Sequence, residues 1–396
     1  MSDSKLLPFH DWLVRIRREL HQIPELGYQE KKTAAKICQI LDQLQIAYHA
    51  GVGGTGVVAR FASRHKGPVA AFRADMDALP IQESNDRDYK SQHPGMMHAC
   101  GHDGHITVAL GIIRWLQQQN WPEKGCGEVI FFFQPAEEGG AGAKSMLDTG
   151  LFDSEPVGAI FAGHMNPELP MGRVELIYGT AHAAADTLKI QINGKGGHGA
   201  SPHLCIDPIV ASAHLITQLQ VFASRNLAPL DSAVLSIGKF HAGTAENIIP
   251  EKADLLGTLR TMSPEIQALA VKRIDEMVRG LEIAHGVTAT FECIPGYPAQ
   301  INDDDLVAFL KSCAEDVLGA EAVHIGRPRM GAEDFCFFCQ KWPGAMVGLG
   351  CHDPAKGYQF PLHSPNFDMD ERVLDVGVLL FGQALMRYLE KKNASR

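Results

Sequence analysis

The chain has 396 residues, of which 45% are hydrophobic and 21% charged, and its formal net charge is −10. This composition excludes a disordered chain, a collagen and a coiled-coil array, and the acidic total argues against a nucleic-acid binder, which needs a basic face. A small anionic substrate is not excluded, because local charge can oppose the total. Nine cysteines at scattered spacings do not suggest a disulfide framework. Eighteen histidines point to metal or acid–base chemistry.

The N-terminus and the hydrophobic runs favour a cytoplasmic protein without a membrane partner. Met1–Pro8 contains Asp3 and Lys5 and lacks the apolar run of roughly 7–15 residues that is typical of a signal peptide. No stretch approaches the roughly 18 apolar residues that span a bilayer. In a reducing cytoplasm the thiols would stay free to act as ligands.

From about residue 10 to residue 183, apolar runs alternate with helical patterns. A helix is predicted within residues 30–46, where apolar residues recur at helical spacing. Strands are predicted at 57–61, 69–72, 128–133 and 159–162, and further helices at 106–119 and 143–149. This alternation predicts a mostly parallel sheet with helices on its faces.

A second pattern occupies residues 184–295. Strands are predicted at 187–192, 233–240, 253–259 and 287–293, and helices at 207–222 and 263–285, each with a proline at its start. The order βαββαβ can form its own four-stranded sheet. The prediction is therefore an α/β domain with a mostly parallel mixed sheet, residues 1–183 and 296–396, interrupted by an inserted α+β domain, residues 184–295.

A glycine-rich segment, Gly51–Gly56, matches the pattern G-x-G-x-x-G. This pattern indicates a dinucleotide site only where it follows a strand and opens a helix. Here it follows a helix and a polar loop and precedes the predicted strand 57–61. We interpret it as a loop.

The segment HACGHDGH at residues 98–105 holds three histidines, a cysteine and an aspartate. Thiolate and neutral imidazole both bind Zn²⁺ and related metals. A loop through Gly101 could turn Cys100 and His102 onto one metal, and Asp103 could orient a ligand imidazole. The alternative is a polar loop around a buried cysteine.

Two adjacent carboxylates, Glu137 and Glu138, follow the predicted strand 128–133. Open α/β sheets place ligands at the carboxyl ends of their strands. One carboxylate could bind a metal while the other takes a proton from water. Alternatively, both simply begin a helix, where glutamate is favourable.

Three further places on the main domain could contribute to a site. His164 follows the predicted strand 159–162, and His363 lies in a loop stiffened by two prolines. The segment 330–335, MGAEDF, puts two acids after a glycine turn, where they could line a site or cap a helix.

The inserted domain adds three polar candidates. His198 lies in a glycine-rich loop after a strand, and Asn247 and Arg260 come later in the domain. The planar guanidinium of Arg260 suits a substrate carboxylate. A surface ion pair is the alternative for Arg260.

The joint pattern resembles the aminoacylase/carboxypeptidase superfamily of dinuclear metallohydrolases. More narrowly, it is similar to the amidohydrolase branch of hippurate hydrolases, N-acyl-L-amino acid amidohydrolases and auxin-conjugate hydrolases. The segments that carry the resemblance are, in order, RRELHQIPELGYQE (17–30), RADMDALP (73–80), MHACGHDGH (97–105), FQPAEEGGAGA (133–143), GHM (163–165), GKGGHGASPH (194–203), NIIP (247–250), MGAEDF (330–335) and PLHSPNF (361–367).

The resemblance implies a zinc-peptidase-like catalytic domain interrupted by a smaller lid domain that usually dimerises. It implies two divalent metal ions per subunit, Mn²⁺, Zn²⁺, Co²⁺ or Ni²⁺, held by Cys100, His102, Glu138, His164 and His363. It makes Glu137 the general base. It also implies that His198, Asn247 and Arg260 contact the substrate carboxylate or the transition-state oxygen, with the histidine supplied by the partner subunit in some relatives.

One position departs from the wider superfamily, which has a His-x-Asp ligand motif where this chain has Asp75-Met-Asp77. Within the branch His102 takes the place of that histidine. We expect Asp77 to orient a ligand without touching the metal.

The resulting prediction is a metal-dependent amidohydrolase that splits an N-acyl amino acid into a carboxylic acid and a free amino acid. It would act as a homodimer or higher homo-oligomer through the inserted domain, with no nucleic-acid partner. One alternative is a metallo-carboxypeptidase or dipeptidase of the same superfamily. Another is a metal-independent cysteine hydrolase that uses Cys100 as nucleophile with His98 or His102 as base.

Overall fold

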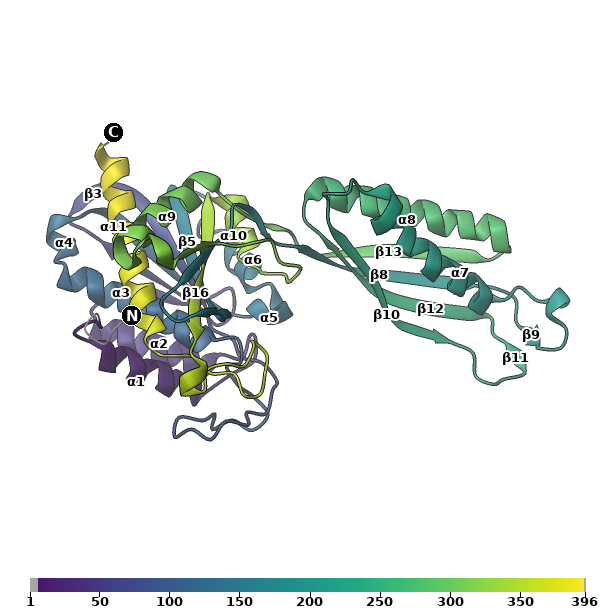
Figure 1. Cartoon of the computed structure of the whole chain (residues 1–396), viewed down its shortest axis with the longest axis horizontal. Coiled ribbons are helices and arrows are strands. Elements are labelled where there is room, and N and C mark those ends of the chain that lie inside the picture. The colour runs from purple at the N-terminus through teal and green to yellow at the C-terminus, as the bar shows by residue number, and fades with distance from the viewer. Residues whose placement is uncertain (1–5, 395–396) are drawn as a thin grey trace. The chain divides into compact units, whose positions relative to one another are not determined.

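The computed structural model describes residues 6–394, so part of the N-terminal segment Met1–Pro8 lies outside the described residues. The chain divides into two compact units. The first comprises residues up to Gly179 together with Ile301–Arg327 and the chain from Phe337 onward, and the second comprises Thr180–Gln300 and Pro328–Cys336. Figure 1 shows the elements of both units.

The first unit is built on an eight-stranded sheet of order β1-β2-β4-β3-β5-β16-β6-β15. Four neighbouring pairs are parallel, β3 with β4, β3 with β5, β5 with β16, and β6 with β15. The other three pairs are antiparallel. The predicted mostly parallel mixed sheet is therefore confirmed. The strands are β1 (Ala47–Val52), β2 (Gly56–Ala62), β3 (His65–Asp75), β4 (Cys126–Gln134), β5 (Val157–Pro170), β6 (Val174–Leu176), β15 (Val323–Ile325) and β16 (Gly344–His352).

The central strands are apolar on both faces because helices pack against the sheet. Phe131, Phe132 and Phe133 of β4 are consecutive and fully buried, as expected where both faces are covered. The helices of this unit are α1 (His10–His21), α2 (Lys31–Gln43), α3 (His102–Gln118), α4 (Trp121–Lys124), α5 (Glu137–Gly140), α6 (Gly142–Leu147), α9 (Asp304–Leu318) and α11 (Val373–Ala394), with α10 (Cys336–Lys341) starting at the boundary between the units.

Helices α3 and α11 pack closely against each other and against β3. A Cβ atom at Gly111 of α3 would lie 2.4 Å from Cγ2 of Val378 in α11, so only glycine permits this approach. The predicted helix at 106–119 was wrong at its start, because α3 begins at His102. Gly101 adopts a left-handed conformation, φ 84°, that turns the loop into the helix. Hydrophobic periodicity does not reveal such a turn.

The second unit contains the predicted order of elements, β8 (Ala184–Asn193), α7 (Pro208–Val221), β10 (Ala233–Ala242), β12 (Lys252–Thr261), α8 (Pro264–His285) and β13 (Thr288–Tyr297). Its sheet has the order β10-β12-β8-β13, and all neighbours are antiparallel. Asp207 caps α7 and Ser263 caps α8 through side-chain hydrogen bonds to backbone amides. The unit also contains the shorter strands β9 (Gly197–His198) and β11 (Ile248–Ile249), while β7 (Gly179–His182) and β14 (Gln300–Asn302) cross its boundaries with the first unit.

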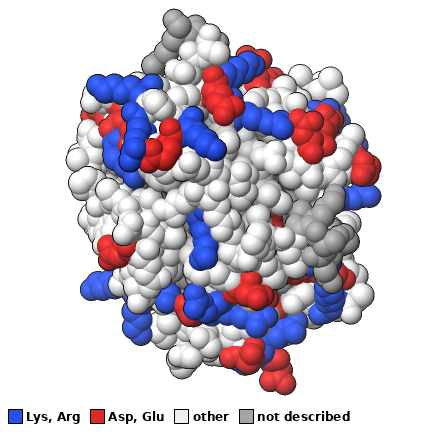
Figure 2. All heavy atoms as spheres, turned by 90° about the vertical axis from the view of Figure 1, so that its left-hand side faces the viewer, with Lys and Arg blue, Asp and Glu red and all other residues white. Residues whose placement is uncertain are grey.

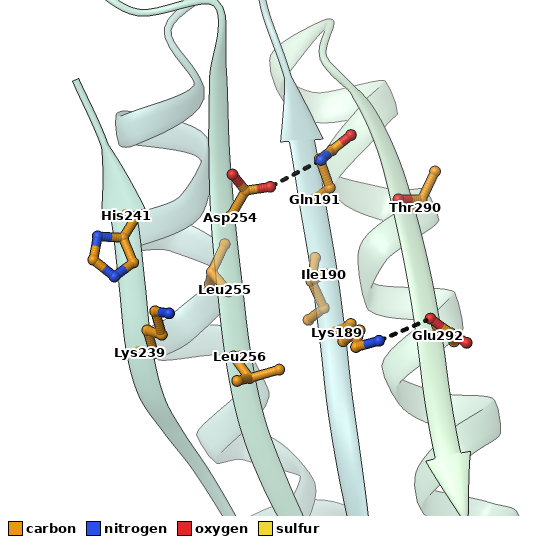
Figure 3. A pocket seen from close by; sticks show the side chains of 10 residues that line it. All are labelled: Lys189, Ile190, Gln191, Lys239, His241, Asp254, Leu255, Leu256, Thr290 and Glu292. Atoms are coloured by element: carbon orange, nitrogen blue, oxygen red, sulfur yellow. Dashed lines mark hydrogen bonds and ion pairs between the residues drawn. The ribbon is translucent and has the colours of Figure 1, made fainter. Parts of the chain in front are cut away.

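Only one face of this four-stranded sheet is covered by helices of its own unit. Leu188, Ile190 and Ile192 of β8 form a core with apolar residues of α7 and α8. On the other face lies an open cavity of about 550 Å³, where Gln191 donates a hydrogen bond of 2.8 Å to Asp254 (Figure 3). Because side chains alternate along a strand, Arg260 lies on the same open face as Asp254.

The described part of the chain shows two surface properties that bear on its partners. Among residues 6–394, none of the helices combines the length and the apolar content that crossing a bilayer requires. On the face shown in Figure 2, basic and acidic side chains are interspersed mainly in the upper and lower parts of the view, and few charged side chains lie between them.

Candidate metal centre

The predicted donor residues come from neighbouring strand ends of the first unit. β3 ends at Asp75, which pairs in register with Gln134 at the end of β4. On the other side of β3, Arg73 pairs with Ala162, two residues before His164 of β5. Because these three strands are parallel, the residues that follow meet at one edge of the sheet, where α/β proteins place ligands.

Two groups of donor atoms meet at this edge. The ligand atoms of Cys100, His102 and His164 lie within 4.8 Å of one another, and so do those of Cys100, Glu138 and His363. Cys100 Sγ is 3.6 Å from His164 Nε2, and His363 Nε2 is 3.2 Å from Glu138 Oε1. All five predicted ligands are therefore together, and Cys100 belongs to both groups.

Two buried atoms of this cluster lack a hydrogen-bond partner. The first is His102 Nε2, whose ring donates from Nδ1 to the Asp77 carbonyl oxygen at 2.8 Å. Its nearest acid, Asp75 Oδ2, is 3.6 Å away, too far for a hydrogen bond. The second is Glu138 Oε1, which lies near His363 but outside hydrogen-bond geometry. Buried unpaired polar atoms are rare in proteins, so this donor set fits metal ions that would give each of these two atoms a partner.

His164 is also prepared to act as a ligand. Its Nδ1 donates to the Met165 carbonyl oxygen at 2.9 Å, which leaves the Nε2 lone pair facing Cys100. Burial lowers the pKa of His164 well below its usual value, and the neighbouring His105 lowers it further. The ring is therefore neutral, which is the form that binds metals.

The neighbouring His105 cannot bind a metal as it stands, although it lies close to Asp75 and His102. Its Nε2 accepts a hydrogen bond from the Met165 amide at 2.9 Å, so its Nδ1 carries the proton donated to Asp75 Oδ1 at 2.5 Å. Burial opposes the charge of Asp75, but Arg73 and the two neighbouring histidines hold its pKa well below the usual range. The pair of His105 and Asp75 was not predicted from the sequence. The spacing of His105, one helical turn after His102, is the feature that could have placed His105 beside the cluster.

The thiol of Cys100 needs a positive neighbour to ionise. Burial raises the pKa of Cys100 well above its usual range, and His102 offsets this only in part. Burial lowers the pKa of His102, but Asp75 and Cys100 raise it more, so that it lies well above its usual value, whereas burial lowers that of His164. A protonated His102 would stabilise the thiolate that a metal-independent cysteine hydrolase uses, and a metal ion would stabilise it as well.

His363 is the least buried of the five donors. Its side chain is 52% exposed, against 18% for Glu138 and 1% for His102. The residue adopts a left-handed conformation, φ 63°, and its amide donates to the Ala99 carbonyl oxygen at 2.8 Å. Contact with the Glu138 carboxylate raises the pKa of His363. The proline-flanked loop is thus fastened directly to the segment that carries Cys100.

The two glutamates are held through their backbone by Asp77. Asp77 Oδ1 accepts the Glu137 amide at 3.0 Å, and Oδ2 accepts the Glu138 amide at 2.9 Å. Because the Asp77 carbonyl also binds His102, this residue holds donors on both sides of the cluster. Glu137 is buried, with a carboxylate oxygen within 4.8 Å of the donor atoms of His102 and Glu138.

The suggestion that Asp103 orients a ligand imidazole was wrong. Its Oδ2 accepts hydrogen bonds from Arg17 Nε at 2.9 Å and from His21 Nδ1 at 2.7 Å. All three side chains are buried. The aspartate therefore links α3 to α1. Sequence spacing alone does not show whether an aspartate at this position binds a ligand imidazole or side chains of another helix.

The second unit separates its three predicted residues into two places. His198 of β9 pairs with Ile248 of β11, and the Gly199 amide donates to the Asn247 carbonyl oxygen at 2.8 Å. Both residues lie beyond the end of β12 that starts at Lys252. Arg260 is near the other end of β12, eight residues after Lys252. At about 3.3 Å per residue, this corresponds to roughly 26 Å along the strand. Within one unit, His198 and Asn247 are close together and Arg260 is remote from both.

Comparisons with known proteins identify the family of the chain. The model of peptidase family M20/M25/M40 matches residues 71–387. IAA-amino acid hydrolase ILR1-like 4 of Arabidopsis thaliana is 39% identical, over 99% of this chain and 89% of the relative. N-acetylcysteine deacetylase of Bacillus subtilis (strain 168) is 38% identical, over 96% and 98% of the two chains.

A solved structure has a similar fold over nearly the whole chain. The crystal structure of the Bacillus subtilis YXEP protein, described as a dinuclear metal binding peptidase from the M20 family, superposes with a TM-score of 0.85 at 35% identity, covering 96% of this chain and 99% of that one. The resemblance inferred from the motifs is thereby confirmed, together with the prediction of a hydrolase. The chain belongs to peptidase family M20/M25/M40.

Proposed function

We propose that the chain is a metal-dependent amidohydrolase that cleaves the amide bond of N-acyl amino acids. The observation that carries this proposal is the convergence of five donor side chains beside a further carboxylate, Glu137. The relatives include an IAA-amino acid hydrolase and an N-acetylcysteine deacetylase, names that both describe removal of an acyl group from an amino acid. The products would be a carboxylic acid and a free amino acid.

The donors suit two divalent metal ions that share Cys100. One would be held by Cys100, His102 and His164, and the other by Cys100, Glu138 and His363. Mixed sulfur, nitrogen and oxygen donors accept Zn²⁺, Mn²⁺, Co²⁺ or Ni²⁺, and availability selects among them. When bound, the ions would polarise the amide carbonyl and lower the pKa of a water molecule.

Glu137 would serve as the general base. Asp77 holds its amide, so its carboxylate stays next to the donor cluster without being needed as a ligand. That carboxylate would take a proton from the attacking water and then donate it to the leaving amine, as one group can do in both steps.

His198, Asn247 and Arg260 would bind the substrate from two different subunits. The pair His198/Asn247 lies beyond the Lys252 end of β12, and Arg260 lies roughly 26 Å along the strand from Lys252, so all three cannot reach one small molecule within one unit. Two copies of the chain, related by a two-fold axis, would bring the pair from one subunit to the arginine of the other. Arg260 would then bind the substrate carboxylate.

The second unit offers a surface for this dimer. The exposed side of α7 carries Ile209, Val210 and Val221, and the adjacent edge strand β10 carries exposed Val234 and Phe240. An edge strand has unpaired backbone groups that can pair with a second copy, and the apolar helix side can pack against its equivalent.

We place the protein in the cytoplasm, since its nine cysteines are free.

A release assay over a panel of N-acyl amino acids tests the proposed activity. We expect free amino acid to appear from acetyl, benzoyl or longer acyl conjugates. Turnover should stop with chelator, return with Mn²⁺, Zn²⁺ or Co²⁺, and require the free carboxylate that Arg260 would bind. Activity that survives chelator but not iodoacetamide would instead indicate the cysteine hydrolase, and release from unblocked dipeptides alone would indicate a dipeptidase.

Replacing Cys100 tests the ligand set. Cys100→Ala should weaken metal binding by more than about 100-fold, because even loss of a residue outside the coordination shell costs about 10–100-fold. Cys351→Ala is the matched control, since Cys351 is also buried but lies outside the donor groups. Metal content after dialysis, measured by mass spectrometry, separates the two variants. Equal metal content in both would remove Cys100 from the ligand set.

The adjacent glutamates should respond differently to the same substitution. Glu137→Gln should lower kcat by roughly 10²–10⁴-fold with metal retained, as loss of a general base does. Glu138→Gln should instead lose metal, because it removes one donor charge. Metal content and kcat measured on both variants check this division, and near-normal turnover by Glu137→Gln would contradict it.

Mixed subunits test the shared substrate site. His198→Ala and Arg260→Ala should each be nearly inactive alone. Coexpressed, they should recover about a quarter of wild-type activity, because half of the dimers are mixed and each mixed dimer has one intact site out of two. No recovery in dimers shown to be mixed would place all three residues in a single subunit's site or outside it.

A further inference from the structure

The turn that carries Glu137 and Glu138 has an unusual backbone. Between Pro135 and Gly142, three residues are left-handed: Ala136 with φ 50°, Gly139 with φ 90° and Ala141 with φ 53°. For alanine this conformation is unfavourable, because its Cβ crowds the backbone. Such a conformation persists only where its surroundings hold it.

Two buried carboxylates hold three successive amides of this turn. Asp77 accepts those of Glu137 and Glu138, as described above. Glu30 accepts the amide before them, that of Ala136, with 2.8 Å between Oε1 and the nitrogen. The side chain of Glu30 thus binds the left-handed residue from which the chain turns into the site.

Glu30 is fixed in turn by the glycine-rich segment Gly51–Gly56. Its Oε2 accepts a hydrogen bond from Thr55 Oγ1, and the residue is fully buried. The segment packs tightly against α6, because a Cβ at Gly53 would lie 2.6 Å from the Met146 nitrogen. Burial raises the pKa of Glu30, while the bonds from Thr55 and the Ala136 amide lower it in part.

Tyr28 contacts the far end of the same turn. Its hydroxyl donates to the Gly140 carbonyl oxygen at 2.7 Å. A Cβ at Gly54 would lie 3.0 Å from the Tyr28 ring, so the ring lies against the glycine-rich segment. Glu30 and Tyr28 therefore bind the turn directly, and Thr55 acts on it through Glu30. None of the three belongs to the metal-donor cluster.

We propose that Glu30 is a positioning residue for Glu137 and Glu138, acting through the Ala136 amide with the support of Thr55 and Tyr28. This assigns a purpose to two sequence features that the metal centre leaves unexplained, the end of the segment 17–30 and the glycine-rich segment. The catalytic consequence rests on the function proposed for Glu137, whereas the effect on the turn does not.

Without the Glu30 side chain, the Ala136 amide would be buried without a partner, and the turn would relax toward right-handed backbone. Relaxation would rotate the peptide that leads into Glu137. A displacement of about 1 Å at a reacting group can cost about 100-fold in rate. The substitution Glu30→Gln would avoid this, because the new side-chain oxygen can still accept the Ala136 amide and the new NH₂ group can donate to Thr55.

Hydrogen exchange of the metal-free, full-length protein tests the contact itself. In Glu30→Ala the amides of residues 136–138 should exchange about tenfold faster or more, and in Glu30→Gln within about threefold of wild type. Thr55→Val is a milder variant that retains shape and should show an intermediate effect. Thr33→Val is the matched control, because Thr33 is a buried threonine bound to Glu25, which does not contact the turn.

Kinetics of the metal-loaded protein test the consequence. Per folded protein, Glu30→Ala should lower kcat about 10–100-fold with little change in KM and should weaken metal binding by Glu138, whereas Glu30→Gln should restore both. Thr33→Val should leave kcat unchanged even if it lowers the melting temperature.

The outcomes separate the two proposals. Unchanged exchange at residues 136–138 in Glu30→Ala, or damage by Glu30→Gln equal to that by Glu30→Ala, would overturn the positioning role. If Glu30→Ala does not fold, an exchange and kcat profile of Thr55→Val identical to that of Thr33→Val would overturn it as well. Faster exchange with unchanged kcat, together with an active Glu137→Gln, would leave the contact established and contradict the general base.

Discussion

The site depends on Asp77 more than on any other single residue outside the donor set. Its carboxylate binds the amides of both glutamates, and its carbonyl binds the ring of His102. The residue lies two positions after the end of β3, the strand between β4 and β5, so its position is set by a buried strand inside the sheet. Rigid strands thereby define the distance between donors that come from segments far apart in the sequence.

The same arrangement sorts the histidines into two classes. A ring with both nitrogens paired, such as His105, contributes to packing and to the charge balance of Asp75. In a ring such as His102, one nitrogen makes a hydrogen bond that fixes the orientation of the ring, and the other nitrogen has no hydrogen-bond partner. The proton position on each ring therefore follows from backbone groups, which is how a protein prepares neutral imidazole for a metal.

Much of the fold could be predicted because the signals are local. Apolar runs indicated the central strands, and the proline-initiated helices of the second unit begin where Asp207 and Ser263 cap them. The start of α3 could not be predicted, because it depends on the left-handed Gly101. The residue types favoured a metal at Cys100 and His102, whereas His164 and His363 are single histidines that only the family resemblance joined to the cluster.

Other features depend on contacts that a sequence does not display. The partners of Asp103 are on α1, more than 80 residues away, so adjacency to His102 was misleading. Glu30 and Tyr28 lie within a recognised segment, yet their contacts with the turn at residues 136–140 exist only in the folded chain. The spacing between Arg260 and His198 likewise becomes meaningful only once the register of β12 and β8 is known.

The unequal burial of the donors has a consequence for how the protein would respond to metal supply. The donor group with His363 includes a side chain that is 52% exposed, whereas in the group with His102 and His164 the first side chain is 1% exposed and the second is partly buried. Exchange with the surrounding solution would begin at the more exposed donor group. With two ions bound as proposed, the protein would pass through a singly loaded state, and its activity would follow the occupancy of the more exposed donor group as the supply of metal rises and falls.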